Sequence, residues 1–407
     1  MALNRRQLLG TAAAAAAMTQ VPRAYAQSDS IVVSSIYDQS GGLDVYGKPV
    51  ADLVRFAVAE QNAKGGLLGK EIVLKEYDPQ SNNQLYAQFA KRTALADKPA
   101  AVFAGITSSS REVVRPILRQ AKTLYFYTTQ YEGGVCDRNI FCTGVTPAQT
   151  VQKLVNHTMA KTGKKAYIVA ADYNYGQITA DWVKKFTLDN GGEVLNTEFF
   201  PLDVADFGSS ISKIQAANPD FVYSALVGGA HMSFYRQWKA AGMLGKIQLS
   251  STTFAGGNEH IALPAEEYNG HWICQNYLQE LPGERNKKLV ADFHKMFGED
   301  YPYITELGMG AYQAFLLWAA AVEKAGTVDR MAVIEALETG ISVDAPSGRV
   351  TVDPATHHTI VDVHVSEARD KQLNLIEKFE QQPPADTSAV CDLINNPDDN
   401  QQYVIEL

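Results

Sequence analysis

Positive charge, cysteine and long apolar runs are all scarce in this sequence. Its 407 residues include 36 lysines and arginines against 45 aspartates and glutamates, which gives a net charge of −9. This balance argues against a nucleic-acid-binding surface, because such surfaces rest on clustered basic side chains that neutralise phosphates. Four cysteines are too few for a mini-protein held together by a disulfide framework. The length and the 46% apolar content predict instead two or three domains with full-sized cores.

Motifs of catalytic and cofactor sites are also missing. There is no G-x-S-x-G elbow, no H-E-x-x-H pair, and no G-x-G-x-x-G after the first expected strand. Residues 65–70 (GGLLGK) resemble a phosphate loop only superficially, because the spacing is one residue short and Glu71 follows the lysine. His357 and His358 lack a third metal ligand at a suitable spacing. We therefore expect neither catalysis nor a cofactor or metal site.

Residues 1–26 have the order of a secretory signal peptide. Arg5 and Arg6 precede a weakly apolar run at 11–18, and residues 24–26 (AYA) form a small-residue cleavage site. The paired arginines indicate the bacterial twin-arginine route, and the apolar run falls far short of the ~20 residues that span a bilayer. Cleavage removes three basic residues and no acid, leaving 381 residues with a charge of −12. We expect a periplasmic protein.

Because disulfides persist in oxidising compartments, the expected export makes disulfide bonds among the four cysteines plausible. Cys136 and Cys142 are six residues apart in a Gly-rich turn region and could close a small loop. Cys274 and Cys391 could pair across a long gap. Four cysteines allow three connectivities, and the sequence does not choose among them.

From Ser30 onward, short β-rich runs alternate with longer amphipathic ones. Such alternation indicates βαβ crossovers and a parallel sheet, and apolar strands such as 100–104 fit a sheet covered on both faces. The expected strands are 31–37, 71–77, 100–104, 124–127, 166–170, 193–199, 221–226, 247–250 and 270–277, and the expected helices are 49–64, 82–96, 112–120, 148–162, 177–190, 207–217 and 230–241.

The last third of the chain follows a different pattern. We expect helices at 306–325 and 328–339, antiparallel strands at 349–352, 360–365 and 373–379, and a poorly regular tail at 380–407. Roughly nine strands before this region exceed one comfortable core, so we expect an α/β fold of two doubly wound parallel-sheet lobes joined by a hinge. The first lobe is expected to hold 27–147 plus about 276–350, and the second 148–275 plus about 351–407 with the tail.

Candidate ligand-binding residues lie in the loops that follow these strands, because open α/β sheets bind ligands beyond the carboxyl ends of their strands. The loops are rich in hydroxyl groups, glycine and tyrosine and hold no histidine before His260. This composition suits hydrogen bonding to a small polar molecule and not proton transfer. Four tyrosines that follow two of the strands could line a site for a flat ligand or could be ordinary half-buried side chains; they are Tyr127, Tyr131, Tyr173 and Tyr175.

Two serines mark the start of the helix after strand 100–104. Ser109 and Glu112 have the spacing of a capping box. In addition, Ser108 and Ser109, with the free N–H groups of the helix terminus, could hold a ligand oxygen. The two interpretations are compatible, because one serine can cap the helix while its neighbour faces a cleft.

A further set of motifs occurs in a fixed order between residues 30 and 380. It comprises 62–70 (NAKGGLLGK), 127–133 (YTTQYEG), 139–141 (NIF), 143–147 (TGVTP), 172–175 (DYNY), 227–229 (VGG), 234–235 (FY), 345–348 (APSG) and 357–358 (HH). The first motif looks like the turn that marks the branched-chain amino acid binding superfamily of type I periplasmic solute-binding proteins. The others are similar to its urea- and short-chain-amide-binding subfamily.

This resemblance implies a Venus-flytrap fold, a ligand held between the lobes, and delivery to the permease subunits of an ABC importer. The family's ligand contacts fall on Ser108, Tyr127, Thr129, Tyr173 and Tyr175. The loop after strand 100–104 looks one residue shorter than in the family, with Ile106 or Thr107 where an aromatic is expected. Our full set of candidate ligand-binding residues is Ser108, Ser109, Tyr127, Thr129, Gln130, Tyr131, Tyr173, Tyr175 and Gly228.

The chemistry of the loops separates two classes of ligand. An amino acid needs an acid for its ammonium group, because an unpaired desolvated charge is costly. In the family's amino acid binders that acid lies in the loop after the strand at 247–250, where this chain has Phe254, Gly256 and Gly257, with only Glu259 beyond. We therefore favour urea or a short-chain aliphatic amide, bound by a monomer. The alternatives are an amino-acid-binding protein of the same transporter class, an amide sensor that regulates amidase expression, and a secreted hydrolase.

Overall fold

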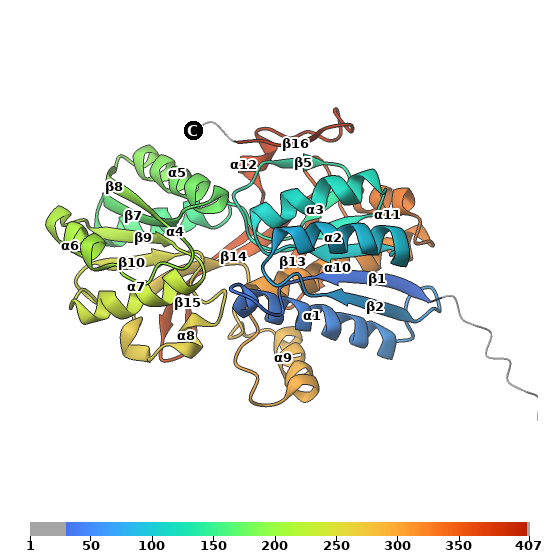
Figure 1. The fold of residues 1–407 in the computed structure, drawn as a ribbon, viewed down its shortest axis with the longest axis horizontal. Coiled ribbons are helices and arrows are strands. Elements are labelled where there is room, and N and C mark those ends of the chain that lie inside the picture. The colour runs from blue at the N-terminus through green and yellow to red at the C-terminus, as the bar shows by residue number, and fades with distance from the viewer. Residues whose placement is uncertain (1–29, 405–407) are drawn as a thin grey trace, which may run out of the picture.

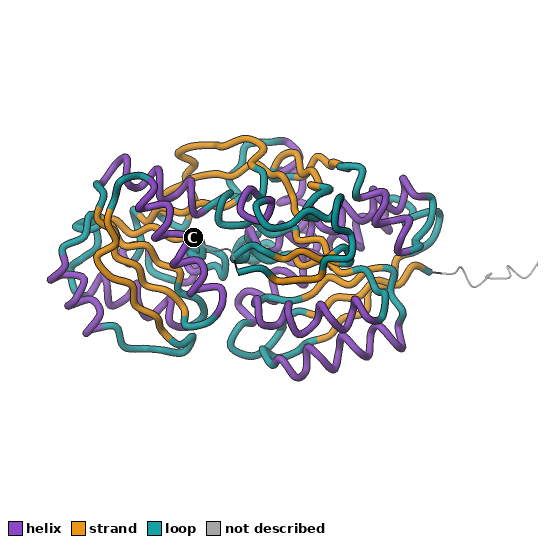
Figure 2. Tube along the Cα trace, turned by 90° about the horizontal axis from the view of Figure 1, so that it is seen from above, coloured by secondary structure: helices purple, strands orange, loops and turns teal. Residues whose placement is uncertain are grey.

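The computed structural model describes residues 30–404, so the expected signal peptide at 1–26 lies outside the described residues. Two α/β bodies lie side by side, and one long strand, β14 (His358–Arg369), runs between them (Figures 1 and 2). We call the body built on the strands between residues 31 and 142 the first lobe. The body built on the strands between 165 and 275 is the second lobe. Among residues 30–404, no helix combines the length and apolarity that a membrane crossing needs.

The first lobe is built on parallel strands, which are largely buried on both faces except for the edge strand β2 (Ile72–Tyr77). Their order is β2, β1 (Ile31–Ile36), β3 (Ala101–Ala104), β4 (Tyr125–Tyr127) and β6 (Ile140–Cys142), followed by the start of β14. Helices α1 (Asp44–Ala63) and α10 (Glu306–Ala325) cover one face of this sheet, and α2 (Asn83–Arg92) and α3 (Ser108–Gln120) cover the other (Figure 1). A π-helical turn (Thr93–Asp97) continues α2.

The second lobe repeats this plan. Its strands run in the order β8 (Glu193–Phe200), β7 (Lys165–Ala171), β9 (Phe221–Ala225), β10 (Gln248–Ser251) and β11 (His271–Gln275), all parallel, and then β14 and β15 (Gln372–Gln382), which are antiparallel. Its helices are α4 (Val151–Thr162), α5 (Asn174–Asp189), α6 (Gly208–Ala217), α7 (Gly229–Ala240) and the short α8 (Glu259–Ala262), with a 3-10 turn at Ala265–Glu267.

Strand β14 joins the strands of the two lobes into one 14-stranded sheet. Its first residues pair with β6 and with β13 (Gly348–Asp353), and its later residues pair with β11 and β15. Strand β12 (Ser342–Ala345) follows helix α11 (Arg330–Leu337) in the chain and pairs antiparallel with β13. Helix α9 (Glu284–Phe297) lies against α1, with the rings of Phe56 and Phe293 5.5 Å apart. The expected arrangement of two doubly wound lobes with a connection between them is confirmed.

The C-terminal segment differs from the sequence-based expectation. Instead of an irregular tail from 380 onward, β15 continues to Gln382, and α12 (Ala385–Ser388) and β16 (Asn400–Gln402) follow. Strand β16 pairs with β5 (Val135–Asp137), so the end of the chain lies against the first lobe and not, as expected, with the second (Figure 1). The short strands β5 and β6 were not predicted, because three-residue strands have no measurable periodicity. Helix α9 was not predicted either.

Neither of the two pairings that the sequence made plausible, Cys136–Cys142 and Cys274–Cys391, is formed. Cys136 is bonded to Cys391, with their Cα atoms 5.4 Å apart, across a sequence separation of 255 residues. The pairing of β5 with β16 brings the C-terminal segment to Cys136. Cys142, in contrast, is fixed in β6 between β4 and β14, where it is buried and free, and Cys274 is likewise buried and free in β11.

A close contact between α10 and the loop after β4 positions the candidate site. A Cβ atom at Gly310 would lie 2.3 Å from the carbonyl oxygen of Thr128, so only glycine fits there. The Thr143 hydroxyl donates a 2.9 Å hydrogen bond to the carbonyl oxygen of Gly310. The loop that begins at Thr128 is therefore held firmly on α10.

Candidate functional site

A small cavity of about 40 Å³ lies between the lobes at the carboxyl ends of the parallel strands. This is where an open α/β sheet is expected to hold a ligand. None of the lining side chains carries a charge at neutral pH. They are Tyr46, Ile106, Thr107, Ser108, Tyr127, Thr129, Gln130, Tyr173, Tyr175, Val227, Thr253, Gly256 and Leu307.

Helix α3 points its N-terminus at the first-lobe side of this cavity. Thr107 is the N-cap, and its side chain accepts a hydrogen bond from the N–H of Ser110 while Ser110 accepts from the N–H of Thr107. The capping pair is thus Thr107 with Ser110, and not Ser109 with Glu112 as the sequence suggested. The N–H groups of Ser108 and Ser109 have no acceptor within the helix, so the partly positive helix terminus can receive a ligand oxygen.

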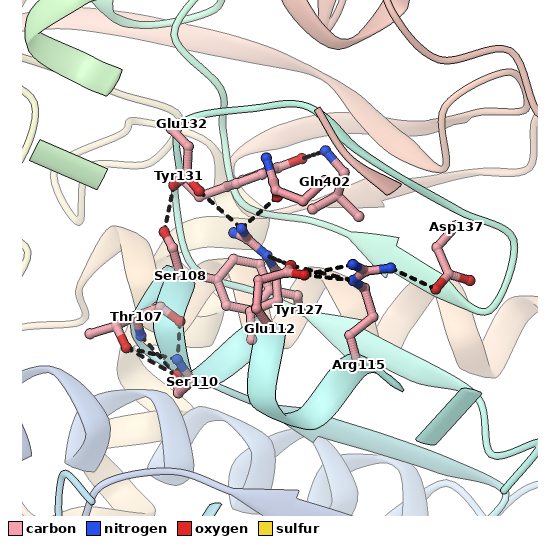
Figure 3. A network of polar contacts seen from close by, with 12 residues as sticks. Thr107, Ser108, Ser110, Glu112, Arg115, Tyr127, Tyr131, Glu132, Asp137 and Gln402 are labelled. Atoms are coloured by element: carbon pink, nitrogen blue, oxygen red, sulfur yellow. Dashed lines mark hydrogen bonds and ion pairs between the residues drawn. The ribbon is translucent and has the colours of Figure 1, made fainter. Parts of the chain in front are cut away.

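A buried ion pair stands behind Ser108 (Figure 3). The Ser108 hydroxyl donates to one oxygen of Glu132, and the guanidinium of Arg111 donates to the other at 2.9 Å. Arg111 and Glu132 are 0% and 1% exposed. The guanidinium lies over the rings of Tyr127 and Tyr131, 5.0 and 4.4 Å from their centroids. Because the Ser108 proton is engaged by Glu132, the hydroxyl presents only lone pairs to the cavity.

Three further hydroxyl protons around the cavity are also engaged. Tyr127 donates to the carbonyl oxygen of Ile106 at 3.2 Å and Thr129 to that of Gly105 at 3.1 Å. On the second-lobe side, Thr253 donates to the carbonyl oxygen of Leu226 at 2.9 Å. A carbonyl oxygen can only accept, so each of these hydroxyl groups must donate to it and faces the cavity as an acceptor. The cavity wall therefore suits a molecule that carries N–H groups.

Tyr46 connects the two lobes across the cavity. It lies in the first turn of α1, and its hydroxyl donates to Glu259 of α8 at 3.3 Å and accepts from the N–H of Gly228 at 3.0 Å. Two further bonds cross between the lobes. Gln130 donates to the carbonyl oxygen of Thr252 at 2.9 Å, and the Trp182 indole donates to that of Glu132 at 3.3 Å. These contacts hold the lobes together in the form described.

Two buried carboxylates near the cavity have opposite pKa shifts. Burial opposes the ionisation of Glu259, but His231, 3.6 Å away, and the N–H of Gly257 outweigh it and lower the pKa of this carboxyl. Glu306, next to the lining residue Leu307, has one side-chain oxygen without a hydrogen-bond partner among the residues described, and burial raises its pKa to about 8. Glu306 is thus mostly protonated and neutral at pH 7.

Six of the nine candidate residues lie on the cavity: Ser108, Tyr127, Thr129, Gln130, Tyr173 and Tyr175. The other three do not. Ser109 is exposed on α3, Tyr131 is buried behind the cavity with its hydroxyl bonded to His358, and Gly228 contributes its N–H to Tyr46.

The sequence reasoning missed Tyr46 and the second-lobe residues Val227, Thr253 and Gly256 as lining residues. The loop after β1 was considered only as far as Gly42. Continuing four residues into the helix would have reached Tyr46. Between residues 30 and 404, no cluster of His, Cys, Asp and Glu could hold a metal ion.

Comparisons with known proteins agree with this architecture. Residues 31–387 match the family described as "Periplasmic binding protein domain". "Leu/Ile/Val-binding protein homolog 7" of Brucella suis is 25% identical over 260 residues, and the match spans 61% of this chain but only 64% of that relative's length.

Two solved structures share the fold at low identity. A solute binding protein of an ABC transporter from Rhodopseudomonas palustris BisB5, in complex with 3,4-dihydroxybenzoic acid, has a TM-score of 0.79 at 20% identity and covers 88% of this chain and 99% of its own. An amino acid ABC transporter substrate-binding protein from Pseudomonas fluorescens Pf-5 has a TM-score of 0.79 at 18% identity, covering 90% and 99%.

Two doubly wound lobes that enclose a hydroxyl-lined cavity define the class of type I periplasmic-binding-protein folds, and the likeness to these solved structures confirms that fold. The match over 31–387 covers most of the chain. The chain belongs to the periplasmic binding protein family.

Proposed function

We propose that this protein is the extracytoplasmic substrate-binding component of an ABC importer and that it binds urea or a short-chain aliphatic amide in the cavity between the lobes. The observation that carries the proposal is the polarity of the cavity wall. The hydroxyl groups of Ser108, Tyr127 and Thr129 donate inward to the protein and offer acceptors to the ligand. The amide N–H groups of such a ligand match these acceptors, and its single carbonyl oxygen matches the N-terminus of α3.

The charges around the cavity favour a neutral solute over an amino acid. An amino acid would bring a desolvated ammonium group, which needs a carboxylate in contact with it. Glu132 is paired with Arg111, Glu259 is paired with His231 and Tyr46, and neither lines the cavity. The acid of Glu306 has a pKa of about 8 and is mostly uncharged at neutral pH. Family relatives named as amino acid binders keep this ligand class as the alternative.

A carboxylate ligand such as a hydroxybenzoate fits less well. No lysine, arginine or histidine lines the cavity. Arg111, which lies behind Tyr127, is committed to Glu132 and fully buried. The anion would rely on the helix terminus and on the hydroxyl groups of Tyr173 and Tyr175. It would also face the hydroxyl oxygens of Ser108, Tyr127 and Thr129, whose protons are donated elsewhere.

Equilibrium titration calorimetry on the purified protein lacking residues 1–26 tests the ligand. We expect heat of binding with urea, formamide or acetamide and none with leucine or 4-hydroxybenzoate. Binding of leucine alone would favour the alternative that the protein binds amino acids. Binding of the benzoate alone would overturn the polarity argument.

A matched pair of variants ties the ligand to the cavity. Thr129 and Thr187 are both buried threonines that donate to a backbone carbonyl oxygen, but only Thr129 lines the cavity. Thr129→Val should weaken binding of the amide about tenfold, the usual size for one lost hydrogen bond. Thr187→Val should leave the affinity unchanged, and equal losses in both would place the ligand elsewhere.

The cellular role is tested by location. An importer component that acts as a monomer outside the cytoplasm should be recovered from the periplasm in processed form, starting near Gln27. Recovery of the unprocessed chain from the cytosol would favour the amide-sensor alternative instead.

A further inference from the structure

Helix α3 carries a row of arginines on one face. Arg111, Arg115 and Arg119 are spaced by four residues, which stacks them along one side of a helix. The row begins one turn after Ser108 at the cavity and ends at Arg119, near the end of α3.

The arginine row binds the C-terminal segment of the chain, which we call the C-terminal strap (residues 383–404). Arg115 donates to the carbonyl oxygen of Asn400 at 2.8 Å, and Arg119 donates to that of Asp398 at 3.3 Å. Arg111 donates to the side-chain oxygen of Gln402 at 2.7 Å. The strap therefore supplies an acceptor to every arginine of the row.

The strap is also fastened to the loop that holds Glu132. The Cys136–Cys391 disulfide and the pairing of β16 with β5 fix one side of this loop. Next to Glu132, the N–H of Gly134 donates to the Thr387 hydroxyl at 3.0 Å. In the segment that follows β6, the hydroxyl of Thr146 donates to the buried Asp386 at 2.8 Å.

Gln402 connects these two sets of contacts through one side-chain amide. Its oxygen accepts from Arg111, and its nitrogen donates to the carbonyl oxygen of Gly133 at 2.8 Å. Gln402 thus holds both the cation that pairs with Glu132 and the backbone next to Glu132 (Figure 3). The path from the strap to the cavity is Gln402 to Arg111, Arg111 to Glu132, and Glu132 to Ser108.

Arg111 has few other partners that could keep it in place. Its Nε donates to Glu112 at 3.0 Å, and its Nη2 is shared between Glu132 and Gln402. Its Nη1 is buried without a hydrogen-bond partner among the residues described. Loss of the Gln402 oxygen would therefore leave Nη2 with Glu132 alone, and the ion pair would be free to shift.

We propose that Gln402 is a positioning residue for the ligand site and that the disulfide-anchored C-terminal strap makes ligand affinity depend on the Cys136–Cys391 bond. This inference rests on the proposed function, because it assigns the strap an effect on the Ser108 acceptor. Gln402 does not line the cavity and acts only through Arg111 and Glu132. Reduction of the disulfide releases the middle of the strap from β5 and loosens the same path.

The test compares Gln402→Ala with Gln401→Ala in the protein lacking residues 1–26. Gln401 is the exposed neighbour, and no side-chain hydrogen bond links it to the arginine row. We expect Gln402→Ala to weaken the affinity for the amide about tenfold and Gln401→Ala to leave it within twofold. A purely structural role would change the melting temperature without this difference in affinity, so both quantities are measured for each variant.

A double-mutant cycle with Ser108→Ala identifies the path. If Gln402 acts through Ser108, its removal should cost little further affinity once the Ser108 hydroxyl is gone. Additive losses would overturn the proposed path, and equal affinities for wild type, Gln401→Ala and Gln402→Ala would overturn the positioning role.

Hydrogen–deuterium exchange without ligand separates this inference from the proposed function. Gln402→Ala, and reduction of the wild type with dithiothreitol, should speed exchange in the segments 105–112 and 130–135. The Cys136→Ser/Cys391→Ser variant should exchange as fast as the reduced protein in these segments, and dithiothreitol should not change its exchange rate. Unchanged exchange would overturn the inference. Altered exchange in a protein that binds none of the amides would refute the ligand assignment and leave the strap's contact with the ion pair standing.

Discussion

The two lobes place a buried carboxylate near the cavity in different ways. In the first lobe, Glu132 reaches the cavity through Ser108, and its counter-ion Arg111 lies in the same lobe. In the second lobe, Glu259 is paired with His231 and reaches the cavity through Tyr46, which belongs to the first lobe. The contacts of Glu132 with Ser108 and Arg111 lie within one lobe and do not depend on the angle between the lobes. The contact of Glu259 with Tyr46 joins the two lobes and exists only when they are close. One unit thus sets the hydrogen-bonding pattern of the cavity wall, and the other links the two lobes across it.

Loss of the first-lobe carboxylate should have the largest effect. Glu132→Ala leaves the guanidinium of Arg111 buried without its carboxylate, and such changes cost about 3–5 kcal/mol of unfolding free energy. Urea denaturation measures this loss. Glu112→Ala is the control, because Glu112 also pairs with Arg111 but is 27% exposed, so its removal should cost less. Equal losses would show that Arg111 does not depend on Glu132.

The unpaired carboxylate of Glu306 supplies a test through pH. Its pKa in the folded protein, about 8, is above the ordinary value of 4.5, so the folded state keeps a proton that the unfolded chain has released. The stability from this proton is complete below pH 4.5 and is lost as the pH rises through 8. Glu306→Gln should therefore match wild type at pH 5 and exceed it by about 1–3 kcal/mol at pH 9. Thermal melts at both pH values measure the difference, and a constant offset would contradict it.

The contact between the lobes should contribute less to folding and more to closure. Tyr46→Phe removes the bonds to Glu259 and Gly228, and we expect about tenfold weaker ligand binding. Small-angle scattering with ligand should detect a larger open fraction. Tyr312→Phe is the matched control, because its hydroxyl binds Glu60 within the first lobe, away from the cavity. If both variants bind the ligand equally well, Tyr46 does not stabilise closure.

The smallest effect is expected at Ser109. It was a candidate ligand contact, but it is exposed and outside the cavity, and its hydroxyl lies 2.9 Å from that of Thr107. Ser109→Ala should change ligand affinity by less than about twofold and stability by about 0.5 kcal/mol or less. Titration calorimetry alongside Ser108→Ala measures the contrast. A tenfold loss at Ser109 would place the ligand further along α3 than the cavity implies.

Much of the fold could be predicted from local patterns. The apolar stretch at 306–325 is α10 with the predicted bounds, closed by the N-cap Thr305 and by Gly326. The parallel strands of both sheets, apart from β6, were predicted to within about two residues, because buried parallel strands are short apolar runs between helices. The start of α3 was displaced by four residues, because Thr107 and Ser110 cap it and neither was recognised as the capping pair.

The candidate site was predicted only in part. Ser108, Tyr127, Thr129 and Tyr173 lie at or just after the ends of strands, so a rule about strand ends finds them. The same rule also selected Tyr131, whose ring turns away from the cavity to pack on Arg111 and His358. Side-chain direction within an irregular loop has no periodicity that a sequence could reveal.

The sequence by itself determined the alternation of strands and helices, the two lobes and the hydroxyl-rich loops, because these depend on patterns a few residues long. Only the tertiary structure decided that Cys136 pairs with Cys391, that Tyr46 spans the lobes and that the Ser108 proton points to Glu132. The physical reason is distance along the chain. These contacts join residues 255, 213 and 24 positions apart, and which of many possible partners meet is settled only when all the elements pack together.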